Sequence, residues 1–486
     1  MGGKVAKNTA YLTSAFVGQK VLSFVYFTII ARTVGVDGAG RYFIAVSFTT
    51  IWSVFVDLGL ANVLVREVAK FPEKAQKLFA NVLGMKVILA ILSVLGANLT
   101  ARLLGYPGET RLMIMIASAV MVLDSTHLVL YAVMRGYQNL KYEAIGVVSG
   151  QAVTITVGGT FLVMGLPLPF LILALLCGST WNVIWSAWSL KRKFGVLPMF
   201  RLDGSVVRFF WSVTIPFALA GIFSRVYSYI DSIMLSKLIS ETSVGLYSVA
   251  YKIAFAFQFV PMAFAAAIYP AMSEYYVMDR EKLGRLFAFS LKYLLALAMP
   301  LAFGIATLAT PIIIAVYGIE FAGSILPLQV LMFSLVFAFL YWPAGSLLNA
   351  CDRQAKNTLV MGLTMVGNIV LNAILIPRLS ATGAAISALF GNMILFVGAF
   401  TFAHGLAPWH KRILVTASVK IFLSSVLMGA AILVLRPYVH FLLLIPVGVV
   451  VYGGAVLMTG GITRKEMQGI FSTFLRKGRG VSDIVS

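Results

Sequence analysis

The chain has 486 residues, of which 60% are hydrophobic and only 11% are charged. This balance is typical of proteins that cross a membrane many times, and it excludes an ordinary soluble domain. Two cysteines, Cys177 and Cys351, provide no disulfide framework, and the sequence contains no zinc-protease, phosphate-loop or serine-hydrolase motif. We therefore expect no catalytic residue, no metal and no resident cofactor.

Apolar runs separated by short loops predict an all-α polytopic membrane protein with about fourteen transmembrane helices. The expected spans lie near 10–30, 42–63, 80–103, 112–134, 144–164, 169–190, 210–236, 244–270, 286–310, 324–350, 357–377, 383–403, 414–435 and 441–462. Most of these runs have the roughly 17–25 residues that a helix needs to cross about 30 Å of hydrocarbon.

The basic residues are concentrated in alternate connections between these spans. Of the 38 Lys and Arg residues, about 25 lie on the side of the N-terminus and about 7 on the opposite side. Since cytoplasmic loops carry the excess of positive charge, we expect both termini in the cytoplasm and the protein in the cytoplasmic membrane. This distribution also explains the formal net charge of +21, so we expect no nucleic-acid partner.

The sequence contains an internal repeat at an offset of 205 residues. Four positions after the first span match four positions after the seventh: Arg32, Gly40, Tyr42 and Ala45 with Lys237, Gly245, Tyr247 and Ala250. Six spans separate the copies, so they have the same orientation, and a pseudo-twofold axis along the membrane normal should relate them.

This repeat predicts two six-helix lobes followed by two further helices. The N-lobe with its cytoplasmic linker would cover residues 1–209, the C-lobe 210–412 and the last two spans 413–462. Residues 463–486 combine basic residues with apolar ones at helical spacing. They predict either an amphipathic helix on the cytoplasmic leaflet or a disordered basic tail.

The span at 210–236 carries charged residues deep inside an apolar run. Arg225, Tyr229 and Asp231 share one polar face, while the opposite face is apolar. A charge at this depth normally faces a bundle interior or an aqueous cavity. We interpret the polar face as the wall of a cavity, with a structural salt bridge to another helix as the alternative.

Two lysines could act with Arg225. Lys20 lies in the middle of the first span, which is the repeat partner of the seventh, and Lys252 lies about two helical turns from the outer end of its span. Together these three residues favour an anionic ligand, and phosphate suits Arg especially. Lys86, Lys292 and Lys420 are closer to the cytoplasmic ends, and we expect their side chains to extend to the interface.

The acidic residues inside spans suggest coupling and gating. Asp124 and His127 are one turn apart, so they could share a proton or bind a cation, or form a structural pair. Asp231 is a second candidate for coupling. Asp57 lies near the cytoplasmic end of its span and near Arg66, which suggests a cytoplasmic gate or a helix cap.

Several stretches resemble the polysaccharide-biosynthesis flippases of the multidrug/oligosaccharidyl-lipid/polysaccharide (MOP) exporter superfamily. They are IARTVGVDGAGRYFIAVSF (30–48), VDLGLANVLVREVAK (56–70), MRGYQNLKYEAIG (134–146), IPFALAGIFSRVYSYIDSIMLSKL (215–238), VGLYSVAYK (244–252) and the stretch at 348–387. The resemblance covers most of residues 1–410. It implies a MATE/MOP-like fold with a central cavity, alternating access, and contact of Lys20 and Arg225 with a lipid-linked phosphate.

The sequence therefore favours a flippase for a lipid-linked saccharide phosphate, with membrane lipids and a glycan polymerase or assembly machinery as further partners. Coupling to H⁺, Na⁺ or the membrane potential stays open. A cation-coupled multidrug exporter of the same superfamily would need a net acidic cavity. A lipid II flippase would share the chemistry of the phosphate site. A membrane glycosyltransferase is disfavoured because the longest loop, at 191–209, holds a single acid, Asp203.

Overall fold

The computed structural model describes residues 2–409, 411–463 and 466, so nearly all of the predicted tail at 463–486 lies outside the described residues. The described part is helical, without strands. Its α-helices are α1 Gly2–Asp57, α2 Leu60–Lys70, α3 Ala75–Leu103, α4 Gly108–Gly136, α5 Lys141–Val163, α6 Pro169–Phe194, α7 Gly204–Leu238, α8 Glu241–Ala256, α9 Phe259–Met278, α10 Arg280–Thr307, α11 Ala309–Tyr317, α12 Ile325–Ala350, α13 Gln354–Ala403, α14 Lys411–Leu435 and α15 Phe441–Met458. Two short 3₁₀ helices, η1 Pro72–Lys74 and η2 Ile319–Ser324, precede α3 and α12.

Most of these helices are long and apolar enough to span a membrane. Within the described residues there are 11 such helices, or up to 12 if the bent α7 counts as one span. This confirms the prediction of an all-α, multi-pass membrane protein. The count of fourteen stays a prediction.

Two of the long helices are folded back on themselves. In α1 the backbone leaves the helical region at Gly35, with φ 70°, and the rings of Phe27 and Phe43 lie 6.2 Å apart. A straight helix would separate them by about 24 Å. In α13 the break is at Ser380, with φ 51°, and a Cβ on Gly398 would lie 2.8 Å from Val360. Each of these two elements therefore consists of two antiparallel arms.

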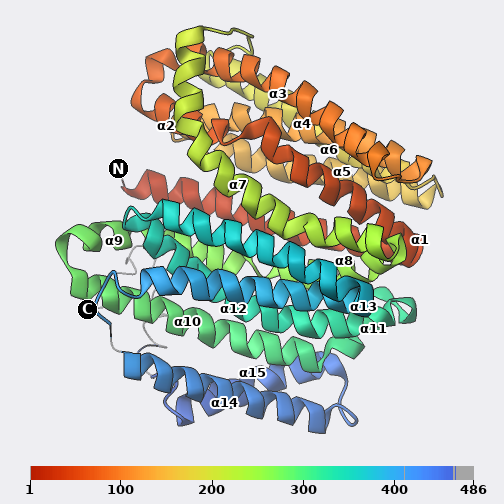
Figure 1. The fold of residues 1–486 in the computed structure, drawn as a ribbon, viewed down its shortest axis with the longest axis vertical. Coiled ribbons are helices and arrows are strands. Elements are labelled where there is room, and N and C mark those ends of the chain that lie inside the picture. The colour runs from red at the N-terminus through yellow and green to blue at the C-terminus, as the bar shows by residue number, and fades with distance from the viewer. Residues whose placement is uncertain (1, 410, 464–465, 467–486) are drawn as a thin grey trace. The chain divides into compact units, whose positions relative to one another are not determined.

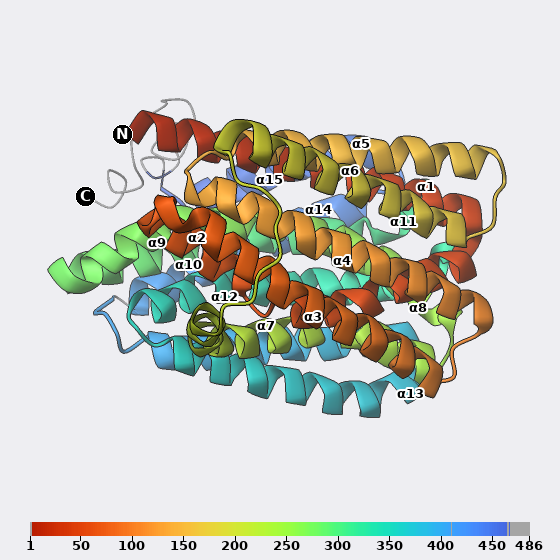
Figure 2. The ribbon, with the colours of Figure 1, turned by 90° about the horizontal axis from the view of Figure 1, so that it is seen from above.

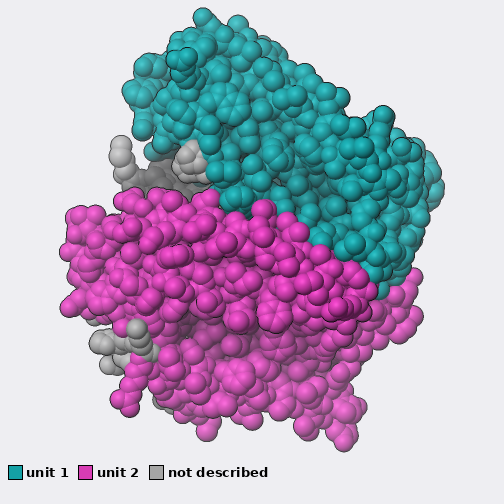
Figure 3. All heavy atoms as spheres, viewed as in Figure 1, with its two compact units in different colours: residues 1–248 teal, residues 249–486 magenta. Residues whose placement is uncertain are grey.

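The structure divides into two compact units, residues 1–248 and 249–486 (Figure 3). In the first unit α6 packs against α4 and α5, α3 lies beside α4, and α1 contacts α3, α4, α5 and α7 (Figures 1 and 2). In the second unit α10 packs against α12 and α14, and α15 lies along α14 (Figure 1). The boundaries of the lobes predicted at 209, 412 and 462 stay a prediction.

Two turns of the first unit meet at positions that the repeat relates. A Cβ on Gly40 would lie 2.0 Å from the carbonyl oxygen of Glu241, and one on Gly245 would lie 1.9 Å from that of Val36. Adding 205 to 40 and to 36 gives 245 and 241, so each contact is the counterpart of the other. Such reciprocal contacts are what a twofold axis between the turns produces, and they support the predicted repeat without establishing it along the whole chain.

An arginine ties the same turns together. Arg41 forms ion pairs with Asp37 at 2.6 Å, with Glu109 at the start of α4 at 2.7 Å, and with Glu241 at the start of α8 at 3.0 Å. Thr110 donates a hydrogen bond to the other oxygen of Glu241. The guanidinium of Arg41 thereby connects acidic residues at the N-terminal ends of three helical segments.

The predicted span at 42–63 is interrupted in the structure. Helix α1 ends at Asp57, Leu58 and Gly59 have φ values of 47° and 86°, and α2 begins at Leu60. The Gly59 amide donates a hydrogen bond to Oδ2 of Asp57 at 3.2 Å, which is an Asx-turn arrangement. The expected uninterrupted span was wrong here because a glycine and an aspartate together stabilise a turn inside the apolar run.

Candidate functional site

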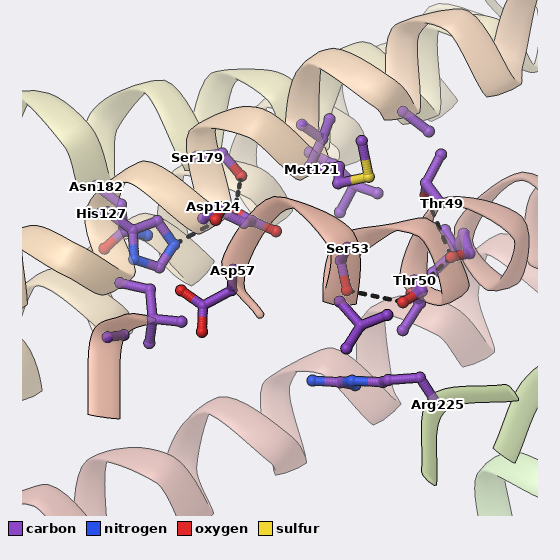
Figure 4. A pocket seen from close by; sticks show the side chains of 18 of the residues that line it. Thr49, Thr50, Ser53, Asp57, Met121, Asp124, His127, Ser179, Asn182 and Arg225 are labelled. Carbon is purple, nitrogen blue, oxygen red and sulfur yellow. Dashed lines mark hydrogen bonds and ion pairs between the residues drawn. The ribbon is translucent and has the colours of Figure 1, made fainter. Parts of the chain in front are cut away.

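The first unit contains a polar cavity of about 910 Å³. It lies between both arms of α1 and helices α2, α4, α5, α6 and α7, and Figure 4 shows it from close by. This volume is within the range of roughly 300–1,000 Å³ found for pockets that enclose a small organic molecule.

Two predicted basic residues line this cavity from packed helices. Lys20 comes from the first arm of α1, and Arg225 comes from α7 with Tyr229 about one turn further on. The two cations are close enough for their charges to repel each other. In Figure 4 the Arg225 side chain extends toward the side of the cavity that holds Asp57. The structure thus brings Lys20, Arg225 and Tyr229 together, while their role stays a prediction.

The Asp124–His127 pair lies on α4 and also lines the cavity. Nε2 of His127 is 3.3 Å from Oδ1 of Asp124, and the hydroxyl of Ser179 donates a hydrogen bond to the same oxygen (Figure 4). The Asp124 side chain is 54% exposed, so its second oxygen can reach a ligand or solvent. Nδ1 of His127 is buried and has no hydrogen-bond partner among the described residues.

Asp57 also lines the cavity, but a buried lysine neutralises it. The Lys86 ammonium lies 2.7 Å from Oδ1 of Asp57 and donates hydrogen bonds to the backbone oxygen, at 2.9 Å, and the hydroxyl of Ser125. The Lys86 side chain is only 4% exposed, so the expectation that it extends to the interface was wrong. Helix α3 starts at Ala75, before the apolar run, and Lys86 is therefore about three turns inside the helix.

Three predicted site residues lie elsewhere. Arg66 is bonded to Glu67 of its own helix at 2.9 Å and does not pair with Asp57, whose carboxylate instead accepts a hydrogen bond from the Gly59 amide and pairs with Lys86. The predicted gate role of Asp57 and Arg66 stays a prediction. Asp231 is 3% exposed, does not line this cavity, and accepts a hydrogen bond from Tyr247 at 2.9 Å. Lys252 belongs to the second unit, and its predicted role in binding phosphate is untested.

Several neutral polar residues of the cavity were not predicted. The amides of Gln19, Asn62 and Gln151 line it, and so does Asn182, whose side-chain oxygen accepts a hydrogen bond from Tyr131 at 3.0 Å. Each amide lies in an apolar segment. That isolation is the signal that could have identified them, because amides inside apolar helices usually face protein or a polar cavity.

The membrane-spanning helices and the charged cavity between them define a membrane transporter as the class of this protein. The family model described as "Polysaccharide biosynthesis protein" matches residues 5–276, which is more than half of the chain. The chain therefore belongs to the polysaccharide biosynthesis protein family. A second model, MatE, matches residues 216–377.

Individual relatives agree with this assignment. A protein of Haloferax volcanii described as "Probable low-salt glycan biosynthesis flippase Agl15" is 22% identical over 79% of this chain and 80% of its own length. A solved structure of the lipid II flippase MurJ in an inward closed conformation has a TM-score of 0.75 at 17% identity, covering 96% of this chain and 99% of that one. An inward-facing multidrug resistance MATE family transporter of the MOP superfamily has a TM-score of 0.67 at 16% identity, covering 80% and 97%. These structures share the fold, which is that of MOP superfamily transporters.

Proposed function

We propose that the protein is a flippase that carries a lipid-linked oligosaccharide or polysaccharide phosphate from the cytoplasmic to the outer leaflet of the cytoplasmic membrane. Both termini would be cytoplasmic, and the product would serve a glycan polymerase or other assembly machinery. The headgroup would enter the cavity of the first unit while the lipid chain stays in the bilayer. Alternating access would then expose the cavity to the opposite side.

The charge balance of the cavity carries this proposal. Its lining contributes Lys20 and Arg225, and Lys86 lies directly behind Asp57. The acids are Asp57 and Asp124. With three basic groups against two acidic ones, the cavity favours an anion, and protonation of His127 would strengthen this preference.

The geometry suits a phosphate attached to a sugar. The planar guanidinium of Arg225 can bind two phosphate oxygens at once, while the Lys20 ammonium supplies a second charge. The cavity amides and the carboxylate of Asp124 offer donors and acceptors for sugar hydroxyls. The membrane potential, negative inside, would favour outward movement by about 2.3 kcal/mol per negative charge per 100 mV. Exchange of H⁺ or Na⁺ through Asp124 and His127 is a second means of coupling.

The test is a transbilayer assay in proteoliposomes that contain a lipid-diphosphate-linked oligosaccharide. Sugar accessibility is scored on each leaflet for the wild type, Lys20→Ala and Arg225→Ala. Each change removes a charge-assisted contact worth about 1.5–3 kcal/mol, so we expect the initial rate to fall at least about tenfold. Lys420→Ala is the matched control, because it removes a lysine of α14 that does not line the cavity.

Each outcome of this assay decides a different point. Normal rates in both variants would reject the site and leave the activity standing. Failure of the wild type with several lipid carriers and ion gradients would reject the flippase, and efflux of cationic dyes would then be measured. A lipid II flippase has the fold of the MurJ structure in its favour. Faster transport of lipid II than of lipid-linked oligosaccharide would establish that alternative.

A further inference from the structure

The segment that joins α6 to α7 is bound along α3 mainly through its backbone. We call residues 195–203 the strap. Gln76 forms two hydrogen bonds with the backbone of Leu197, at 2.8 and 2.9 Å, and the Arg201 amide donates to the carbonyl oxygen of Ala80 at 3.1 Å. At the end of the strap, the Asp203 amide donates to the side chain of Asn81. These bonds fix the course of the strap.

The strap buries Val196 and rests one edge of Leu202 against Gly84 of α3, but it leaves its other large apolar side chains largely exposed. Leu197 is 40% exposed, Met199 55%, Leu202 56% and Phe200 68%. A loop in water would do the opposite, because each Å² of exposed apolar surface costs about 25 cal/mol. The backbone of the strap is hydrogen-bonded to α3, while most of its apolar side chains are exposed on the other side. This arrangement indicates an apolar environment on the outer side of the strap.

The contacts with α3 show the depth at which the strap lies. Arg201 touches α3 at Ala80, where the apolar run of that span begins, and at Gly84 one turn further in. A Cβ on Gly84 would lie 2.5 Å from the Arg201 carbonyl oxygen, so the glycine permits this close approach. The strap is therefore level with the first turns of a membrane span, where headgroups meet acyl chains.

The charge of the strap and its flanks is strongly positive. The residues from 191 to 208 include five basic side chains: Lys191, Arg192, Lys193, Arg201 and Arg208. Asp203 is their single acid, and it is paired with Lys77 at 2.9 Å. Each basic residue near a negatively charged leaflet contributes about 1 kcal/mol of attraction.

We propose that the strap is a docking surface for anionic lipids, with the side chains of Met199 and Phe200 inserted at the boundary between headgroups and acyl chains of one leaflet. The basic residues on either side of it bind the phosphates of that leaflet. The C-terminal tail of this chain is a poorer candidate to cover the strap, because residues 463–486 are also basic and would be repelled by it. This inference does not depend on which substrate the cavity carries.

The test places a fluorophore on the strap of the full-length protein. Cys177 and Cys351 are replaced by Ser, Phe200→Cys is labelled with an environment-sensitive dye, and the protein is reconstituted into vesicles. The vesicles contain phosphatidylcholine alone or an equal mixture with phosphatidylglycerol, with or without lipids that carry a quencher near the headgroup. Glu73→Cys, an exposed position on the neighbouring η1, is the matched control.

We expect the dye at position 200 to show blue-shifted emission, quenching by the labelled lipids and protection from aqueous iodide, all stronger with phosphatidylglycerol. The dye at position 73 should remain accessible to iodide. Replacing Arg201 and Arg208 by Gln removes two of the five basic residues and should clearly weaken the effect of phosphatidylglycerol while leaving insertion into phosphatidylcholine. Equal access of iodide to positions 200 and 73 would overturn the proposal and point to a protein partner. Insertion that ignores the lipid charge would overturn its electrostatic part.

Discussion

At the scale of single residues, the ion pair between Lys86 and Asp57 determines the net charge of the cavity. It converts an acid of the lining into a neutral group, and the cost of burying Lys86 is offset by its hydrogen bonds to Ser125. The cations of the cavity then outweigh the one acid that remains, Asp124. The proposed anion preference of the cavity thus depends on a lysine that does not line it.

Removal of the Lys86 charge should be more damaging than removal of the whole pair. Lys86→Met leaves Asp57 with an uncompensated charge, and breaking a buried pair in this way typically costs about 3–5 kcal/mol. The double variant Lys86→Met with Asp57→Asn should regain much of that stability. Thermal unfolding in detergent measures the stability of the single and of the double variant. If the double variant were no more stable than Lys86→Met, the pair would not be coupled as the distance of 2.7 Å implies.

Asp203 should make the start of α7 sensitive to acid. Hydrogen bonds from the Ser205 hydroxyl, from Lys77 and from the Ser205 amide hold the pKa of Asp203 well below its usual range. A depressed pKa contributes stability above the unfolded value of about 3.9 and loses it as the pH falls toward the folded value. Asp203→Asn, which keeps a side-chain cap, should therefore be slightly less stable than the wild type near pH 7. The difference should narrow progressively as the pH falls below about 4, because only the unfolded state takes up the proton until the pH reaches the lower pKa of the folded state. A difference in melting temperature that does not narrow in acid would assign the effect to the cap geometry rather than to the charge.

At the scale of elements, the contact between the two repeat-related turns depends on glycine. The Val36 carbonyl oxygen occupies the space that a side chain at position 245 would need, and backbone atoms cannot rotate away as a side chain can. Gly245→Ala should therefore separate the turns and lower the melting temperature. Gly159→Ala in α5 is the control, since nothing lies within 4 Å of its Cβ position and alanine favours a helix by about 1 kcal/mol. Equal stability of the two variants would show that the close approach is not required.

The sequence predicts elements well where one helix alone determines the result. The run lengths predicted the helical class, and the polar face of α7 placed Arg225 and Tyr229 on a cavity. The sequence of one helix could not show which residues of other helices contact it. Asp231 shares the polar face, yet Tyr247 of α8 bonds it in a buried position.

Pairings between distant elements were missed for the same reason. Lys86 and Asp57 are 29 positions apart in the sequence and lie on different helices. The helix break at Leu58 and Gly59 depends on a local turn and lies next to that ion pair. The hydrophobicity of the segment therefore could not predict where the helix ends. The charged residues around Arg41 come from three helix starts, which only the packing of the turns brings together.

At the scale of the whole molecule, the strap and the turns around Arg41 belong to opposite membrane surfaces in the predicted topology. The strap follows α6 in a connection rich in basic residues, whereas the Arg41 turns lie in connections with few. The positive-inside rule then assigns the strap to the cytoplasm and the Arg41 turns to the outside. In the proposed function, a phosphate-bearing substrate would enter the cavity from the side of the membrane on which the strap lies.

Two glycines allow this orientation to be tested with matched substitutions. Gly108 begins α4 and Gly204 begins α7, and nothing lies within 4 Å of either Cβ position, so a cysteine fits at both. In a background with Cys177 and Cys351 replaced by Ser, an impermeant maleimide should label Gly108→Cys in intact cells. It should label Gly204→Cys only after the membrane is opened. The reverse pattern would invert the predicted topology and place the strap outside, although the membrane potential, negative inside, would still favour outward movement of an anion.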